Sequence, residues 1–216
     1  MKEKTGAVFS IAKDNQPVAG CTISKEVYAS GQDYISYFSL AKGTDISAEI
    51  YDYHKLLILH EGSMDVYTDK QVWTLSEGEV ILTPTEIPVG MRTGTKAIYT
   101  EISIRRNTMN NAVKAGEVFM LAELVPYQDG KIINMDIAHN EKMKFVIMSF
   151  DEGTGLAEHA APGEALILAL DGKGVIGYGG KAHPIQAGEN FKFAAGGKHW
   201  VKADGRFKMA LLMTLE

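Results

Sequence analysis

Histidines are the side chains best suited to chemistry in this chain, because the motifs of the common nucleophilic and nucleotide-dependent sites are absent. No Gly-X-Ser-X-Gly turn occurs, and nothing marks Cys21, the single cysteine, as a reactive thiol. The glycine-rich segment 177–180 is expected to be a hairpin turn, without the following helix that phosphate binding needs. Three of the six histidines lie in or beside predicted turns and are expected on the surface: His60, His139 and His183. The remaining candidates are His54, His159 and His199.

Strands must position these histidines, and the strands recur along the chain. When the sequence is shifted against itself so that Val8-Phe9 coincides with Val118-Phe119, five pairs of glycines also coincide without a gap. These pairs are Gly6/Gly116, Gly20/Gly130, Gly43/Gly153, Gly62/Gly172 and Gly78/Gly188, and the shift is called here the repeat offset. Glycines and apolar residues are the positions that backbone geometry and packing restrict most. The pattern predicts two copies of one unit, as domains 1–106 and 107–216.

Each copy consists of short apolar runs separated by turns. In the second copy, the runs 165–170 and 175–178 are separated by Asp171-Gly172, and Gly179-Gly180 follows. Such dipeptides between apolar runs are hairpin signals, and strands at this spacing indicate an antiparallel sandwich or barrel. The predicted fold class is therefore all-β, with residues 109–114 as the best candidate for a helix.

Two segments of the second copy resemble the motifs of a known family. The segments HAAPGEALILALDG (159–172) and GENFKFAAGGKH (188–199) resemble the first and second motifs of the cupin superfamily, of the conserved-barrel cupin-2 type. The resemblance implies a double-stranded β-helix, or jelly-roll barrel, for each copy. The chain would then be a bicupin, of an uncharacterised subgroup with a degenerate metal motif. In full cupins the motifs are H-x-H-x(3,4)-E and G-x5-P-x-G-x2-H, and their four ligands hold one divalent metal, a donor set that suits such ions.

The second copy keeps part of this ligand set. His159 occupies the first histidine position, Ala161 replaces the second, and either Glu164 or Ala165 occupies the carboxylate position. His199 matches the histidine of the second motif. The resemblance thus implies a Zn, Ni, Fe or Mn site formed by His159, His199 and Glu164. Strand alternation argues against it, because His159 and Glu164 should face opposite ways unless the intervening Pro-Gly corner breaks the alternation.

Four further residues are candidates for ligand binding. Lys198 and Trp200 flank His199 and could contact an anionic substrate and form a pocket wall, although a solvated lysine and a packed indole are the simpler alternatives. In the first copy, Glu49 and His54 occupy two of the positions that correspond to the motif. They are expected to form a weaker pair in a barrel that has lost the motif histidines.

Composition and charge exclude several classes of function. The net charge is −5 with no run of basic residues, which argues against a nucleic-acid partner. A single cysteine excludes an intrachain disulfide and favours a cytoplasmic location. The sequence contains no stretch of 18 apolar residues, so no membrane-spanning helix is expected. A homodimer and a monomer with two paired barrels are both compatible with the sequence.

The sequence therefore predicts a cytoplasmic bicupin that binds a small molecule in its carboxy-terminal barrel, either through a divalent metal or through two hydrogen-bonded histidines without one. One alternative is a metal-dependent enzyme, an isomerase, decarboxylase or dioxygenase, acting on a small polar metabolite. The other is a non-catalytic effector-sensing or assembly module. Substrate identity depends on pocket side chains, which the fold class does not determine.

Overall fold

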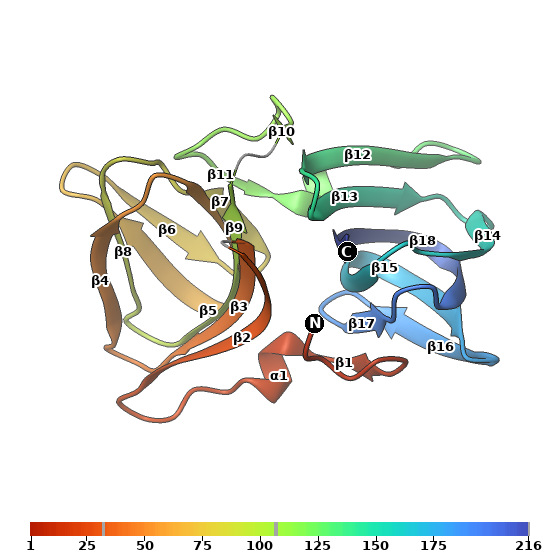
Figure 1. Ribbon diagram of the computed structural model, residues 1–216, viewed down its shortest axis with the longest axis horizontal. Coiled ribbons are helices and arrows are strands. Elements are labelled where there is room, and N and C mark those ends of the chain that lie inside the picture. Colours follow the sequence, from red (N-terminus) through yellow and green to blue (C-terminus); the bar gives the residue numbers. More distant parts are fainter. Residues whose placement is uncertain (32, 106–107, 216) are drawn as a thin grey trace. The chain divides into compact units, whose positions relative to one another are not determined.

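A computed structural model describes residues 1–31, 33–105 and 108–215, and it is built almost entirely from β-strands (Figure 1). The chain divides into two compact units, called here the first and the second barrel. The first barrel contains Ile11–Asn107 and Asn111–Met120, and the second contains Lys2–Ser10, Thr108–Asn110 and Leu121–Glu216.

The first barrel is a jelly roll that begins with the short helix α1 (Ile11–Asp14). Its larger sheet has the order β11-β7-β5-β9-β3-β2, while β4 pairs with β8, and β6 and β8 pair with β5. The strands are β2 (Thr22–Ser30), β3 (Asp33–Leu40), β4 (Asp45–Ile50), β5 (His54–Tyr67), β6 (Val72–Ser76), β7 (Glu79–Leu82), β8 (Pro88–Arg92), β9 (Ala97–Ile104) and β11 (Val118–Met120).

The second barrel repeats this plan, with the sheet order β1-β17-β15-β18-β13-β12-β10, to which β14 and β16 are added. It also contains the 3-10 turn η1 (Leu121–Glu123). The strands are β1 (Val8–Phe9), β10 (Thr108–Met109), β12 (Ile132–His139), β13 (Met143–Phe150), β14 (Gly155–Ala160), β15 (Glu164–Tyr178), β16 (Lys181–Gln186), β17 (Asn190–Phe193) and β18 (Lys198–Thr214).

The two units differ from the ranges 1–106 and 107–216 by an exchange of short segments. Strand β1 pairs with β17 of the second barrel, and β11 pairs with β7 of the first. Val8-Phe9 and Val118-Phe119 are the dipeptides that coincide at the repeat offset. Each repeat therefore contributes its first strand to the sheet of the other unit.

Alternation along the strands fills the interior of each barrel with apolar side chains. In the first barrel, Leu57 and Leu59 of β5 share the core cluster with Tyr99 of β9. In the second, Ala165 and Ile167 of β15 pack with the aromatic side chains of β17. Residues of opposite parity on these strands point away from the interior.

One glycine in each barrel allows the longest strand to bend past its neighbour. Gly62 has φ 90°, and a Cβ atom there would lie 1.9 Å from the carbonyl oxygen of Lys96. Gly172 has φ 70°, and a Cβ atom there would lie 1.9 Å from the carbonyl oxygen of Arg206. Only glycine tolerates both the left-handed backbone and the close approach. The repeat offset carries both members of the first contact onto those of the second, so it corresponds to a repeated backbone geometry.

The helix expected at residues 109–114 is wrong. Met109 lies in β10, which pairs with β12, and a turn follows at Asn111 and Ala112. Asparagine side chains compete for backbone hydrogen bonds and favour turns over helix interiors. Within the described residues, neither α1 nor η1 is long and apolar enough to cross a membrane.

Candidate functional site

Two histidines meet at one edge of the second barrel. His159 of β14 lies directly opposite His199 of β18 in the antiparallel pairing, and their ring centroids are 4.3 Å apart. His159 is exposed, whereas His199 is only 4% exposed. The pair therefore runs from the solvent into the barrel.

Backbone carbonyls fix the tautomer of both rings. His159 Nδ1 lies 2.8 Å from the carbonyl oxygen of Ala157, and His199 Nδ1 lies 2.9 Å from that of Gly197. A carbonyl oxygen can only accept, so each Nδ1 carries the proton and each Nε2 keeps a lone pair. Burial, followed by the neighbouring His159, lowers the pKa of His199, although the bond to Gly197 opposes this. The lowered pKa of His199 favours its neutral form, and the Nε2 atom of a neutral imidazole can accept a hydrogen bond.

Glu164 does not join the histidines. Its carboxylate lies 2.6 Å from Lys192 Nζ, and Lys192 is buried on β17. Ala165, the next residue, takes the inward position on β15 and pairs in register with Phe193. The Pro-Gly corner does not reverse the alternation, so the position open to a carboxylate ligand is occupied by a methyl group.

A three-ligand metal centre is consequently not assembled. Among the residues that the structure describes, no group of three or more His, Cys, Asp or Glu side chains could hold a metal ion. Two imidazoles supply fewer protein ligands than the three that catalytic zinc sites use. The donor set does not fit a resident catalytic metal on His159, His199 and Glu164.

The interior beside the histidines is aromatic. The His199 ring stacks on Phe193, with centroids 3.8 Å apart and planes at 18°. Phe193 in turn contacts Phe191 and Tyr178, with centroids 5.2 Å and 5.4 Å away. A ligand that reaches the histidine pair would meet two acceptor nitrogens and these apolar ring faces.

Lys198 and Trp200 lie on the other face of β18 from His199. Both line a pocket of about 280 Å³, together with Glu158 and the glycine-rich hairpin 177–180. Successive residues of a strand point to opposite faces, so residues adjacent in sequence serve different sides of the sheet. Lys198 and Trp200 therefore line a pocket on the opposite face of the strand from His199, and their role in ligand binding stays a prediction.

In the first barrel, Glu49 and His54 do not pair. Glu49 is exposed and accepts a short hydrogen bond from the Tyr51 hydroxyl. His54 begins β5, where its Nδ1 lies 2.6 Å from the carbonyl oxygen of Thr83. Each of the two side chains has a local partner, so the expected weaker pair is not formed.

The first barrel instead contains a charged cluster that the sequence did not predict. Lys55 Nζ lies 3.2 Å from Glu101 Oε1, and the Tyr34 hydroxyl donates to the same carboxylate oxygen at 2.6 Å. Burial, then the charge and hydrogen bond of Glu101, raises the pKa of Tyr34. The signal in the sequence was the presence of Lys55 and Glu101 at the same strand parity as the core residues Leu57 and Tyr99.

His60 also differs from the expectation of a surface imidazole. It lies within β5, where its Nε2 is 2.7 Å from the Thr100 hydroxyl oxygen of the adjacent β9. Burial lowers the pKa of His60 to about 4. Gly62, where a turn was predicted, lies inside the same strand and pairs with Ala97 of β9.

Comparison with known proteins agrees with this architecture. The cupin domain family matches residues 146–215. The structure of a cupin 2 conserved barrel domain protein from Leptotrichia buccalis is similar over 99% of this chain and 98% of that chain, with 26% identity and a TM-score of 0.85. No sequence among the curated proteins matches.

Salicylate 1,2-dioxygenase from Pseudaminobacter salicylatoxidans shares the fold at 10% identity, covering 84% of this chain and 70% of the enzyme, with a TM-score of 0.60. A gentisate adduct of that enzyme superposes over 84% of this chain and 68% of its own, with 10% identity and a TM-score of 0.60. Identity at this level shows a common fold. The sequence match shows a cupin domain at residues 146–215, and the full-length similarity shows that the whole chain shares the jelly-roll cupin fold.

Proposed function

We propose that this protein binds a small polar molecule in its second barrel and that the His159–His199 pair holds the ligand. The observation that supports the proposal is the fixed tautomer of both rings, whose Nδ1 protons are directed to backbone carbonyls. Two Nε2 lone pairs then accept hydrogen bonds from an O–H or N–H donor of the ligand. The aromatic side chains of Phe193 and Tyr178 supply an apolar face for the rest of the molecule.

Binding in this proposal does not depend on a metal. Cupins often bind a divalent ion, and Zn, Ni, Fe or Mn would be the expected choice here, but the inward position beside the pair is Ala165 and Glu164 pairs with Lys192. Neutral imidazoles can also act as hydrogen-bond acceptors without an ion. An isomerase, decarboxylase or dioxygenase activity would need further groups, and no observation on the described residues favours one of them.

Native mass spectrometry of the protein purified without a chelator tests the proposal. We expect a bound small molecule that dissociates from the His159→Gln/His199→Gln variant but remains in Trp200→Phe, which changes the other face of β18. A molecule retained by the double histidine variant would contradict the proposal, as would the absence of any small molecule from wild type. If wild type instead carries near-stoichiometric metal that is lost in His199→Ala, the metal-dependent alternative is favoured over this proposal.

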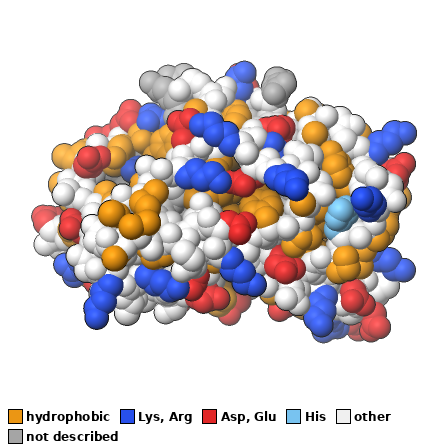
Figure 2. All heavy atoms as spheres, turned by 90° about the horizontal axis from the view of Figure 1, so that it is seen from below, with side chains coloured by type: hydrophobic (Ala, Val, Ile, Leu, Met, Phe, Trp, Pro, Cys, Tyr) orange, Lys and Arg blue, Asp and Glu red, His pale blue; other side chains and the backbone are white. Residues whose placement is uncertain are grey.

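The binding partners, cellular location and oligomeric state of the protein stay predictions. Basic and acidic side chains are interspersed on the face shown in Figure 2, which supports a small-molecule partner rather than nucleic acid. A cytoplasmic location remains the expectation from cysteine usage. A homodimer remains an alternative to a monomer, and size-exclusion chromatography with light scattering distinguishes the two.

A further inference from the structure

A lysine and a glutamate form an ion pair inside the first barrel. Lys55 of β5 and Glu101 of β9 both have inward parity, alongside Leu57 and Tyr99. Their side chains are 9% and 3% exposed, and the two charged groups lie 3.2 Å apart. Removing two charges from water costs several kcal/mol each, and their attraction often fails to recover this.

The second barrel shows that the fold does not need this pair. At the repeat offset, Ala165 corresponds to Lys55 and Leu211 corresponds to Glu101. The register is also equivalent, because Lys55 lies opposite Ser103 as Ala165 lies opposite Met213. Apolar side chains fill the same positions of the same barrel, so the charges in the first barrel point to a role other than folding.

Two buried polar atoms beside the pair lack partners. Glu101 Oε1 is bonded to Lys55 and Tyr34, but Glu101 Oε2 is buried and has no hydrogen-bond partner among the described residues. The Tyr99 hydroxyl oxygen, on the same face of β9, is also buried without one within the described chain. A buried polar atom without a hydrogen-bond partner destabilises the folded state, because its lost hydration is not replaced. Both atoms therefore favour an occupant that completes their hydrogen bonds.

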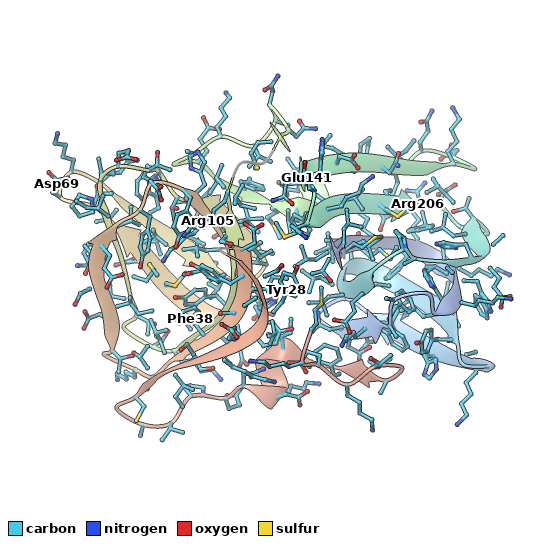
Figure 3. The ribbon with its side chains drawn as sticks, in the orientation of Figure 1. Tyr28, Phe38, Asp69, Arg105, Glu141 and Arg206 are labelled. Atoms are coloured by element: carbon cyan, nitrogen blue, oxygen red, sulfur yellow. The ribbon has the colours of Figure 1, made fainter. Side chains whose placement is uncertain are left out.

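Aromatic side chains enclose the region and limit the charge of the occupant. Phe38, which Figure 3 shows within the first barrel, stacks on Tyr99 with centroids 5.0 Å apart. Lys55 Nζ lies 3.6 Å from the centroid of the Tyr51 ring, and the Arg105 guanidinium lies 3.3 Å from that of Tyr53. The chain's own cations already use these ring faces, and Lys55 balances the charge of Glu101. A further cation or an anion is thus disfavoured relative to a neutral molecule.

The donor and acceptor pattern defines the chemical class. Glu101 Oε2 requires a donor, whereas the Tyr99 hydroxyl can give or accept a hydrogen bond. Burial, with the nearby charge of Glu101, raises the pKa of Tyr99, so this hydroxyl keeps its proton. A hydroxyl group can donate to the carboxylate while a neighbouring hydroxyl accepts from the tyrosine. Neutral compounds with adjacent hydroxyl groups meet both requirements.

Tyr51 is a partly exposed residue that contacts the ion pair. Its ring covers Lys55 and is half-buried, and its hydroxyl donates to the exposed Glu49 at the end of β4. Rotation of this one side chain would uncover Lys55, because tyrosine rotamers exchange without a change in the fold. A ligand would then enter the barrel from the side that bears Glu49.

We infer that the first barrel contains a second, metal-independent binding site, in which Glu101 and Tyr99 hold a small neutral polyol. This site is separate from the His159–His199 pair and uses none of its residues. The inference holds or fails independently of the function proposed for the second barrel.

Saturation-transfer difference NMR with myo-inositol, D-xylose and glycerol as probes tests the inference on the full chain. We expect transfer from at least one probe to wild type, and binding at least roughly tenfold weaker in Tyr99→Phe and Glu101→Gln, since each loses one hydrogen bond to the ligand. The matched control Tyr28→Phe removes a tyrosine hydroxyl from β2 of the same barrel, outside both proposed sites, and should leave the signal intact.

A second variant distinguishes loss of binding from loss of folding. Lys55→Met/Glu101→Leu replaces the pair with apolar side chains of similar volume. The second barrel also has apolar residues, Ala165 and Leu211, at the equivalent positions. The fold of this variant can be checked by circular dichroism. We expect it to fold and to lose the signal, and if it does not fold, Tyr99→Phe alone decides. Absence of transfer from all three probes to wild type, or undiminished transfer to the folded variants, would overturn the inference and indicate that ordered water completes the hydrogen bonds.

Discussion

The indole of Trp200 lies directly on Gly177, the residue opposite it in the pairing of β18 with β15. A Cβ atom at Gly177 would lie 1.9 Å from the indole Nε1. This close approach fixes the Trp200 ring on the outer face of the sheet, where it forms one wall of the pocket of about 280 Å³. The glycine is required for space and not for its backbone conformation, because its φ is not positive.

Gly177→Ala should therefore destabilise the second barrel. The added methyl group must displace the indole, and overpacking of this kind costs about 1–3 kcal/mol. Urea unfolding measures the change in the free energy of unfolding. Gly94→Ala is the matched control, because a Cβ atom there would meet nothing within 4 Å. Equal stabilities for the two variants would contradict the steric role of Gly177.

His60 should make the stability of the first barrel depend on pH. Burial lowers its pKa to about 4, from an ordinary value of 6.5. The unfolded chain therefore binds the proton first as the pH falls, and stability present above pH 6.5 is progressively lost towards pH 4. Two to three pKa units correspond to roughly 3 kcal/mol. Urea unfolding between pH 7.5 and about 4.5 should show this loss for wild type.

His60→Gln provides the comparison, because glutamine can bond the Thr100 hydroxyl without titrating. Its stability should change less than that of wild type over the same pH range. A wild-type curve that is flat, or one that the variant reproduces, would show that His60 titrates normally in the folded chain.

Strand alternation and the internal repeat carried most of what the sequence could predict. Gly62 and Gly172 coincide at the repeat offset because the same bend requires the same residue. Alternation also indicated that Glu164 faces away from His159, and the structure shows Glu164 on Lys192. These inferences succeed because they depend on local backbone geometry.

Contacts between distant strands could not be predicted in the same way. Lys55 and Glu101 meet because β5 pairs with β9 in a particular register, which a single sequence does not specify. The exchange of β1 and β11 between the two barrels depends on which open edge each short strand meets. The sequence predicted a turn near His60. In the structure the strand does not end there, because a bulge after Leu59 keeps His60 within β5.

Removing one member of the Lys55–Glu101 pair should destabilise the protein more than replacing both members with apolar residues. Lys55→Met alone leaves a buried carboxylate, and Glu101→Leu alone leaves a buried ammonium, so each should lose about 3–5 kcal/mol in the free energy of unfolding. The double variant removes both charges and should be more stable than either single variant. Urea unfolding of all four proteins forms a double-mutant cycle. Additive losses would show that the two side chains are not energetically coupled.

Restoring the two missing ligand positions should give the second barrel a metal site. Ala161 and Ala165 occupy the second histidine and the carboxylate positions of the cupin motif, and both are buried. Ala165 pairs with Phe193, whose ring stacks on His199. A carboxylate at position 165 would therefore lie near the His159–His199 pair. The variant Ala161→His/Ala165→Glu would then offer four protein ligands, the number found in full cupins.

Isothermal titration with Zn²⁺ should show binding at least roughly tenfold tighter in this variant than in wild type, because coordination by three or four protein ligands is what holds zinc in proteins. The larger side chains add volume to a packed interior, so circular dichroism must first show that the variant folds. Adding Glu164→Gln to the same background should not weaken the metal, since Glu164 bonds Lys192. A folded variant with wild-type affinity for Zn²⁺ would mean that His159 and His199 do not face the position of the restored ligands.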